Sequence, residues 1–161
     1  LKAYKEEFGK PDYSIVKPAN VYGPRDNFDP ENAMVIGSLL GKALTSSGTI
    51  EVFGKGKSIR DFVFSEDVAT GIYLAAKYGQ GASFNLGSGS GATIKELVDV
   101  LRKVTKRNFE FTNSEEPDYP TRILNINWTP KTDLYSGISK TWEWLMVNPS
   151  FSSKRHNYFA K

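Results

Sequence analysis

The chain has 161 residues, enough for one domain or a large part of one, and its 39% hydrophobic content can form a packed core. It contains no cysteine and a single histidine, His156, so disulfides and thiolate chemistry are excluded, and a histidine-based zinc site or a serine–histidine–aspartate triad is not expected. The net charge of +3 comes from scattered basic residues, which argues against nucleic acid as a partner, and no apolar run approaches the ~18 residues of a membrane span.

The chain begins inside a predicted helix. Leu1–Glu7 has the composition of a helix interior, and Gly9 and Pro11 are expected to end it. We therefore expect the chain to be part of a longer protein. No signal-peptide pattern is present, and we expect a cytoplasmic location, with which the absence of cysteine is compatible, as it is with an oxidising compartment.

Strands and helices then alternate, which predicts an α/β fold. The predicted elements are a strand at 12–17, a long loop at 18–32, a helix at 36–43, strands at 50–53 and 61–64, a helix from Ser65, a strand at 83–86, a helix from Thr93, a strand at 109–111 and a helix from Leu134 that ends near Pro149.

Local patterns support three of these helices. In the helix at 36–43, one face is apolar and comprises Ile36, Leu39, Leu40 and Ala43. Gly37 and Gly41 lower the helix propensity of this segment. Ser65 is a predicted N-cap, and the apolar face of its helix comprises Val68, Ile72, Ala75 and Ala76. Thr93 and Glu96 match a capping box, and the stripe that follows is Ile94, Leu97, Val98 and Leu101.

Tyr13 and Lys17 match the Tyr-x-x-x-Lys pair of short-chain dehydrogenases, in which the ammonium lowers the pKa of the tyrosine. On a helix the two side chains would be about 5–6 Å apart. On a strand, four residues separate them by roughly 13 Å. Because Pro11 and Pro18 flank a predicted strand, we interpret the match as coincidental.

The glycine string Gly87–Ala92 fits the pattern G-x-G-x-x-A between a strand and a helix, with Glu110 about 20 residues further on. The strand before it is short and contains Asn85, whereas the first strand of a dinucleotide-binding fold is an apolar run. We favour an ordinary strand-to-helix loop, and a phosphate-binding loop is the alternative.

A long loop follows the first predicted strand. It contains Lys17–Pro24 and the string Asp26–Pro30, which are rich in proline, glycine, asparagine and aspartate. Ligands of α/β proteins bind at the strand end where such a loop begins. A surface loop of the same composition is the alternative interpretation.

Five strings, in this order and spacing, are together specific although none is so alone: Pro18–Pro24, Val52–Gly56, Ile59–Val68, Phe84–Gly87 and Trp128–Lys131. Through them, residues 1–147 resemble the C-terminal half of the extended short-chain dehydrogenase/reductase family that acts on nucleotide sugars. Asp26–Pro30 makes the GDP-L-fucose synthase branch the most similar. The resemblance implies the last strand or strands of a Rossmann-like sheet plus a small α/β substrate-binding domain.

The resemblance also implies site residues and partners. Pro18, Ala19, Asn20 and Val21 would lie against the nicotinamide end of NAD or NADP. The substrate, a nucleotide-diphosphate sugar, would be bound by Val35, Lys42, Phe53, Arg60 and Arg122. Phe53 would stack on the ligand, and the two arginines would clamp its diphosphate, since a guanidinium matches phosphate oxygens. Surface ion pairs are the alternative role for the arginines. No metal site is implied.

This chain differs from the fucose synthase branch at two residues and in the length of one segment. That branch has a histidine acid/base where Met34 stands and an arginine where Lys42 stands. A methionine cannot transfer protons, so we do not expect the epimerisation of that branch. Only residues 123–127 intervene where the family has a short helix. The catalytic tyrosine and the glycine-rich turn are expected upstream of Leu1, so we assign no catalytic residue to this chain.

We expect three segments: the end of the Rossmann-like domain and a linking loop at 1–32, a nucleotide-sugar-binding domain at 33–147 and a polar tail at 148–161. The leading hypothesis is the substrate-binding half of an NAD(P)-dependent epimerase, dehydratase or reductase that oxidises the sugar transiently. Because members of the family are commonly dimers, the resemblance implies a homodimer. A non-catalytic, nucleotide-sugar-binding or regulatory relative is the alternative.

Overall fold

Helices and short strands alternate along the part of the chain that the computed structural model describes, residues 2–9, 13–79, 81–115 and 128–152, which confirms the α/β class. In chain order the elements are α1 (Lys2–Phe8), β1 (Ile15–Pro18), β2 (Asn20–Tyr22), α2 (Val35–Thr45), β3 (Ile50–Val52), β4 (Ile59–Arg60), β5 (Phe62–Phe64), α3 (Ser65–Tyr78), β6 (Ser83–Leu86), β7 (Ala92–Thr93), α4 (Ile94–Thr105), β8 (Phe109–Phe111), α5 (Leu134–Val147) and the short 3-10 helix η1 (Pro149–Ser152).

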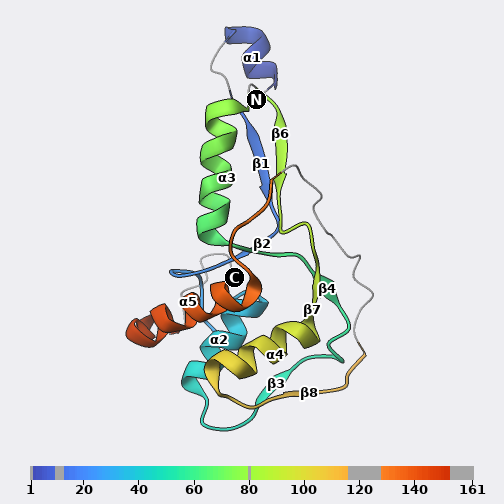
Figure 1. The fold of residues 1–161 in the computed structure, drawn as a ribbon, viewed down its shortest axis with the longest axis vertical. Helices are drawn as coiled ribbons and strands as arrows, with labels where there is room; N and C mark the ends of the chain where they lie inside the picture. The colour runs from blue at the N-terminus through green and yellow to red at the C-terminus, as the bar shows by residue number, and fades with distance from the viewer. Residues whose placement is uncertain (1, 10–12, 80, 116–127, 153–161) are drawn as a thin grey trace, which may run out of the picture.

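The first strand lies beside a strand from the middle of the chain. β1 and β6 pair in parallel, from Ile15 opposite Ser83 to Pro18 opposite Leu86, and α3 runs along them (Figure 1). A parallel pair requires a long crossover connection, and the chain between the two strands supplies it. In space, β1 and β6 form a strand pair against which α3 packs. The division of the chain at residues 32 and 147 stays a prediction.

The buried face of α3 differs from the predicted one. Ile72 is 46% exposed and Ala76 is exposed, so only Val68 and Ala75 of the predicted residues are buried. Gly71 lies against the sheet instead, where a Cβ would be 2.9 Å from both methyl carbons of Leu86. Because the helix approaches the strand so closely, the glycine takes the place of a larger apolar residue.

The larger hydrophobic core lies among α2, α4, α5 and the parallel pair β3–β8, in the lower part of Figure 1. Three residues of the predicted α4 stripe, Leu97, Val98 and Leu101, are completely buried. Other fully buried members include Phe28, Leu40, Phe109, Ile138 and Leu145. These contacts fix α2 and β3 side by side, and both elements contribute to the candidate site.

The predicted loop at 18–32 contains a strand, which corrects the prediction. β2 pairs in parallel with β5, with Asn20 opposite Phe62. The Asn20 backbone N–H and side-chain Nδ2 both donate to the carbonyl oxygen of Asp61, at 3.1 and 2.8 Å. Tyr22 is buried at the end of the strand. The sequence did not predict this strand because proline and glycine flank it and because its partner, β5, is far away in the sequence.

Ser65 does not cap its helix, and the prediction that it would is wrong. It is the first residue of α3; Phe64 occupies the N-cap position without a side-chain capping bond. The Ser65 side chain packs against Gly23, where a Cβ would lie 2.1 Å from the Ser65 Oγ atom. The negative charges of Glu66 and Asp67 in the first turn still interact favourably with the positive end of the helix dipole.

The capping box at the start of α4 is confirmed, and it gives the chain a pH-dependent contribution to stability. The Thr93 N–H and hydroxyl donate to the Glu96 carboxylate at 2.7 and 2.8 Å, and the Glu96 N–H donates to the Thr93 hydroxyl at 3.1 Å. The hydrogen bond from the Thr93 backbone, followed by that from its side chain, holds the pKa of Glu96 below its ordinary 4.5.

Because the folded-state pKa is lowered, this contribution is present above the ordinary pKa and is lost as pH falls through the folded-state value. We expect Glu96→Gln to lower the free energy of unfolding at neutral pH, and the difference from the original chain to shrink below pH 4.5. Urea unfolding at several pH values measures this. Glu143→Gln, on the exposed side of α5, is the control. A difference that is constant with pH would contradict the assignment.

Candidate functional site

A cavity of about 360 Å³ lies beside α2, β3 and β4. It gathers four of the five predicted substrate-binding residues, Val35, Lys42, Phe53 and Arg60. The other lining residues are Asn20, Met34, Ser38, Leu39, Glu51, Val52, Ser58 and Ile94. The fifth predicted residue, Arg122, lies outside the described residues.

One face of α2 forms a wall of the cavity. Val35, Ser38 and Lys42 are spaced three and four residues apart, so they lie on the same side of the helix. The opposite side has Ile36 and Leu40 in the core. The helix therefore presents an apolar residue, a hydroxyl and an ammonium in a row along the cavity.

The strand β3 supplies a second wall. Ile50 and Val52 are buried, at 2% and 4% exposure, so the alternation of a strand turns Glu51 outward. Phe53 follows the strand and is 65% exposed. Gly54 comes next with a φ of 89°, a left-handed conformation that suits glycine and turns the chain immediately after the ring. Phe53 is therefore an exposed aromatic surface beside the cavity.

Arg60 and Asp61 point to opposite sides of the chain at the junction of β4 and β5. Arg60 lines the cavity, and its Nη1 donates to the Ile59 carbonyl at 2.9 Å. Asp61 is completely buried. Its Oδ1 accepts hydrogen bonds from the Ser88 N–H at 2.8 Å and the Ser88 hydroxyl at 2.5 Å. The sequence alone predicted no role for Asp61, although this residue lies within the string Ile59–Val68.

Asp61 also joins the elements that position Arg60. Its carbonyl oxygen holds Asn20 on β2, and its carboxylate holds Ser88 on the loop after β6. A buried carboxylate is costly unless it is hydrogen-bonded, so the Ser88 contact stabilises Asp61, and the two contacts together fix β2 and the loop after β6 relative to β4. Arg60 is opposite Ala92 on β7, in an antiparallel pair. The signal for this role was the charged pair inside an apolar string.

The four predicted cofactor residues are at the carboxyl end of β1. Pro18 ends the strand and Val21 is 36% exposed. The Ala19 N–H donates to the Leu86 carbonyl at 2.8 Å. Of the four, Asn20 lines the cavity. The arrangement thus brings one predicted cofactor residue to the same cavity as the predicted substrate residues.

The Tyr13–Lys17 match lacks the helix that its chemistry requires. Lys17 is in β1, and Tyr13 precedes the strand. The Tyr13 ring instead faces Lys5 of α1, whose Nζ lies 6.0 Å from the ring centroid. This geometry supports the interpretation of the pair as coincidental.

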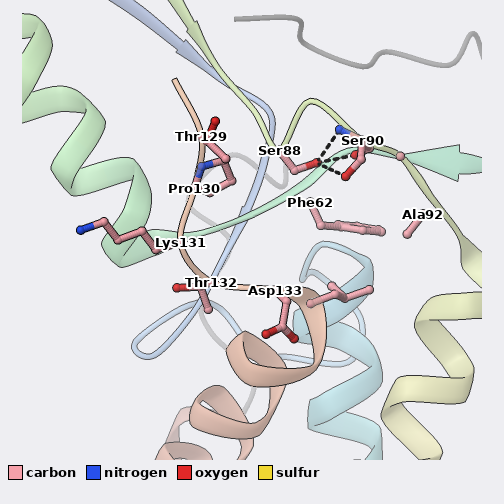
Figure 2. A pocket seen from close by; sticks show the side chains of 11 residues that line it. Phe62, Ser88, Ser90, Ala92, Thr129, Pro130, Lys131, Thr132 and Asp133 are labelled. Carbon is pink, nitrogen blue, oxygen red and sulfur yellow. Dashed lines mark hydrogen bonds between the residues drawn. The ribbon is translucent and has the colours of Figure 1, made fainter. Parts of the chain in front are cut away.

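The glycine string lines a second cavity, of about 340 Å³, shown in Figure 2. Phe62, Ser88, Ser90 and Ala92 are on one side, and the segment 129–134 is on the other. The Lys131 side chain extends away from the two serines (Figure 2). Asp133 caps α5 through the hydroxyl and N–H of Ser136, which hold its pKa below the ordinary value.

The same string does not form a phosphate-binding turn. It leads into β7 before α4 begins, and Glu96 and Thr93 already satisfy groups at the N-terminus of that helix. A phosphate-binding turn uses those N–H groups for the ligand. The structure therefore supports an ordinary loop, whose Ser88 is held by Asp61.

Two negative findings apply to the described residues only. They contain no group of three or more histidine, cysteine, aspartate or glutamate residues that could hold a metal ion. None of the helices in this part of the chain is both long and apolar enough to cross a membrane.

Comparison with known proteins identifies the family of this chain. Residues 1–87 match the model of the NAD dependent epimerase/dehydratase family. The GDP-L-fucose synthase of Sinorhizobium fredii (strain NBRC 101917 / NGR234) is 31% identical over 160 residues, which cover 91% of this chain and 51% of that protein. The UDP-glucose 4-epimerase of Thermotoga maritima, solved with UDP-glucose, is 30% identical with a TM-score of 0.80, over 92% of this chain and 50% of that one.

A further solved structure, the UDP-glucose 4-epimerase of Thermus thermophilus with NAD, has 25% identity and a TM-score of 0.74, over 91% of this chain and 50% of that one. These likenesses define a Rossmann-like α/β fold. The chain belongs to the NAD-dependent epimerase/dehydratase family. It spans about half the length of the curated relatives and solved structures that it matches.

Proposed function

We propose that this chain is the nucleotide-sugar-binding half of an NAD(P)-dependent epimerase, dehydratase or reductase. The observation that carries the proposal is the single cavity that joins Val35, Lys42, Phe53 and Arg60. Arg60 brings a guanidinium to it, which complements the negative charge of a nucleoside diphosphate, and Lys42 adds an ammonium beside the nucleotide. The neighbouring Phe53 ring offers a surface on which the base can stack.

The cofactor would lie at the end of β1, against Pro18–Val21. These residues fit it because Pro18 and Val21 are exposed at the carboxyl end of a parallel strand pair, the edge at which α/β sheets bind ligands. NAD or NADP would supply the hydride acceptor for oxidation of the sugar. Asn20, which lines the substrate cavity, would orient the sugar next to it.

The proton-transfer groups would come from residues upstream of Leu1, so this chain alone is expected to bind substrate without turning it over. Met34 lines the cavity and is 67% exposed, but its thioether cannot transfer a proton. The fucose-synthase epimerisation is therefore not proposed. We place the end of the Rossmann-like domain at 1–32, the nucleotide-sugar domain at 33–147 and a tail at 148–161, in a cytoplasmic protein that can dimerise.

Calorimetric titration of the chain with GDP, UDP and the two corresponding nucleosides tests the proposal. We expect a diphosphate to bind at least about tenfold more tightly than its nucleoside, because the charged phosphate contacts are worth more than about 1.4 kcal/mol. The diphosphate affinity should fall with salt. If neither diphosphate nor the matching nucleotide sugars bind, the proposal is wrong.

A further inference from the structure

Glu51 is the one carboxylate among the described residues that line the substrate cavity. It is exposed between two buried neighbours on β3, on the side of the strand that faces away from the core. Its place in the same cavity as Lys42 and Arg60 is unexpected for a site that binds a diphosphate, since a carboxylate repels phosphate oxygens.

The fold gives Glu51 no stabilising role. On the adjacent strand β8 it is directly opposite Glu110, another exposed carboxylate, and like charges in that position are destabilising. Glu110 accepts a hydrogen bond from the Asn108 side chain at 3.4 Å. Within the described part of the chain, no hydrogen bond or ion pair engages the Glu51 carboxylate. The Glu51 carboxylate is therefore available to a ligand in the cavity.

The surroundings of Glu51 suit a flat base. Phe53 is two residues further along, immediately after the end of β3, and lines the same cavity as Glu51. Its ring can cover a base while the Glu51 carboxylate meets the edge of that base. Lys42 also lines the cavity, and among the described residues no ion pair joins it to Glu51, so the two opposite charges are both available to a ligand.

We propose that Glu51, with Lys42, selects guanine over uracil as the base of the bound nucleotide. Guanine presents N1–H and N2–H donors side by side, which one carboxylate can accept, and its O6 accepts from an ammonium. Uracil presents a single N–H between two carbonyl oxygens, so the carboxylate meets at least one oxygen that it repels. This inference rests on the proposed function and goes beyond it by naming the base.

The expected preference is about tenfold or more for GDP over UDP, because a well-placed bidentate contact discriminates between bases by about 1–3 kcal/mol. An unpaired carboxylate facing uracil adds to this difference. Phosphate contacts contribute equally to both nucleotides, so they leave the ratio unchanged.

Calorimetric titration of the full chain with GDP and UDP, repeated for Glu51→Gln and Glu110→Gln, tests the inference. We expect Glu51→Gln to lower the GDP affinity about tenfold and to raise the UDP affinity, since a carboxamide can pair with the uracil edge. Glu110→Gln removes the same charge one strand away and should leave both affinities unchanged. Thermal unfolding of the variants verifies that each is folded.

Equal affinities for GDP and UDP in the original chain, or an unchanged ratio in Glu51→Gln, would overturn the selection of guanine while leaving nucleotide binding intact. Failure of both nucleotides to bind would overturn the proposed function and this inference with it. A GDP preference that Glu51→Gln abolishes and Glu110→Gln preserves supports it.

Discussion

Arg60→Ala is expected to weaken the binding of GDP and UDP alike, by roughly ten- to a hundredfold. A hydrogen bond to a charged group contributes about 1.5–3 kcal/mol, and the guanidinium can offer two such bonds to a diphosphate. Arg60 is on the short strand β4, where Asp61 and the pairing with β7 hold its backbone. The variant should therefore fold normally and lose affinity only.

The planar shape of the Arg60 guanidinium is expected to contribute to diphosphate binding as well as its charge. Arg60→Lys should bind diphosphates with intermediate affinity, because lysine keeps the positive charge but lacks the planar fork. Lys103→Ala is the control, since Lys103 is exposed on α4 and does not line the cavity. Calorimetry gives the affinities. Unchanged diphosphate binding by Arg60→Ala would remove this residue from the site, as would an equal loss in Lys103→Ala.

The ratio of affinities separates this prediction from the one on Glu51. Arg60 would contact phosphates, which GDP and UDP share, so its loss changes both affinities by the same factor. Glu51 would contact the base, so its replacement changes the ratio. The two variants together therefore distinguish a loss of phosphate contacts, which lowers both affinities, from a loss of base selection, which changes their ratio.

Elements with local signals could be predicted from the sequence. The helix α4 begins at a capping box and has a complete apolar stripe, and both were correct because they depend on residues within one or two turns. The strand β8 and the helix α5 were correct for the same reason.

Features that depend on distant partners could not be predicted. The strand β2 exists because Asn20 meets Asp61, forty-one residues away, and its own sequence resembles a loop. Ser65 has the composition of an N-cap, but its hydroxyl lies against Gly23. The buried position of Asp61 has no periodic signal either. In each case a contact formed by the tertiary fold decided the outcome.

The candidate site came from resemblance rather than from spacing. Val35, Lys42, Phe53 and Arg60 are on different elements, and no local pattern connects them. Their meeting at one cavity follows from the packing of α2 against β3 and from the turn at Gly54–Gly56. Glu51 was missed because a charged residue in a strand is ordinarily an exposed one; its relevance depends on which side of β3 it occupies.

Gly41→Ala is expected to destabilise the fold, although helix propensity alone predicts the opposite. Alanine is about 1 kcal/mol more favourable than glycine inside a helix. At Gly41, however, a Cβ would lie 1.9 Å from the carbonyl oxygen of Phe28, a backbone atom that cannot move without its loop. Overpacking of this kind costs about 1–3 kcal/mol or more, so the free energy of unfolding should fall.

Gly48→Ala is the matched control, because a Cβ there meets nothing within 4 Å and the change should be nearly neutral. Urea unfolding followed by tryptophan fluorescence measures both variants. Higher stability of Gly41→Ala than of the original chain would mean that propensity outweighs the contact with Phe28. The expected loss has a second consequence, since Phe28 belongs to the loop that leads into Met34 and α2. Displacing that loop moves a wall of the cavity, so Gly41→Ala should also weaken diphosphate binding, whereas Gly48→Ala should preserve it.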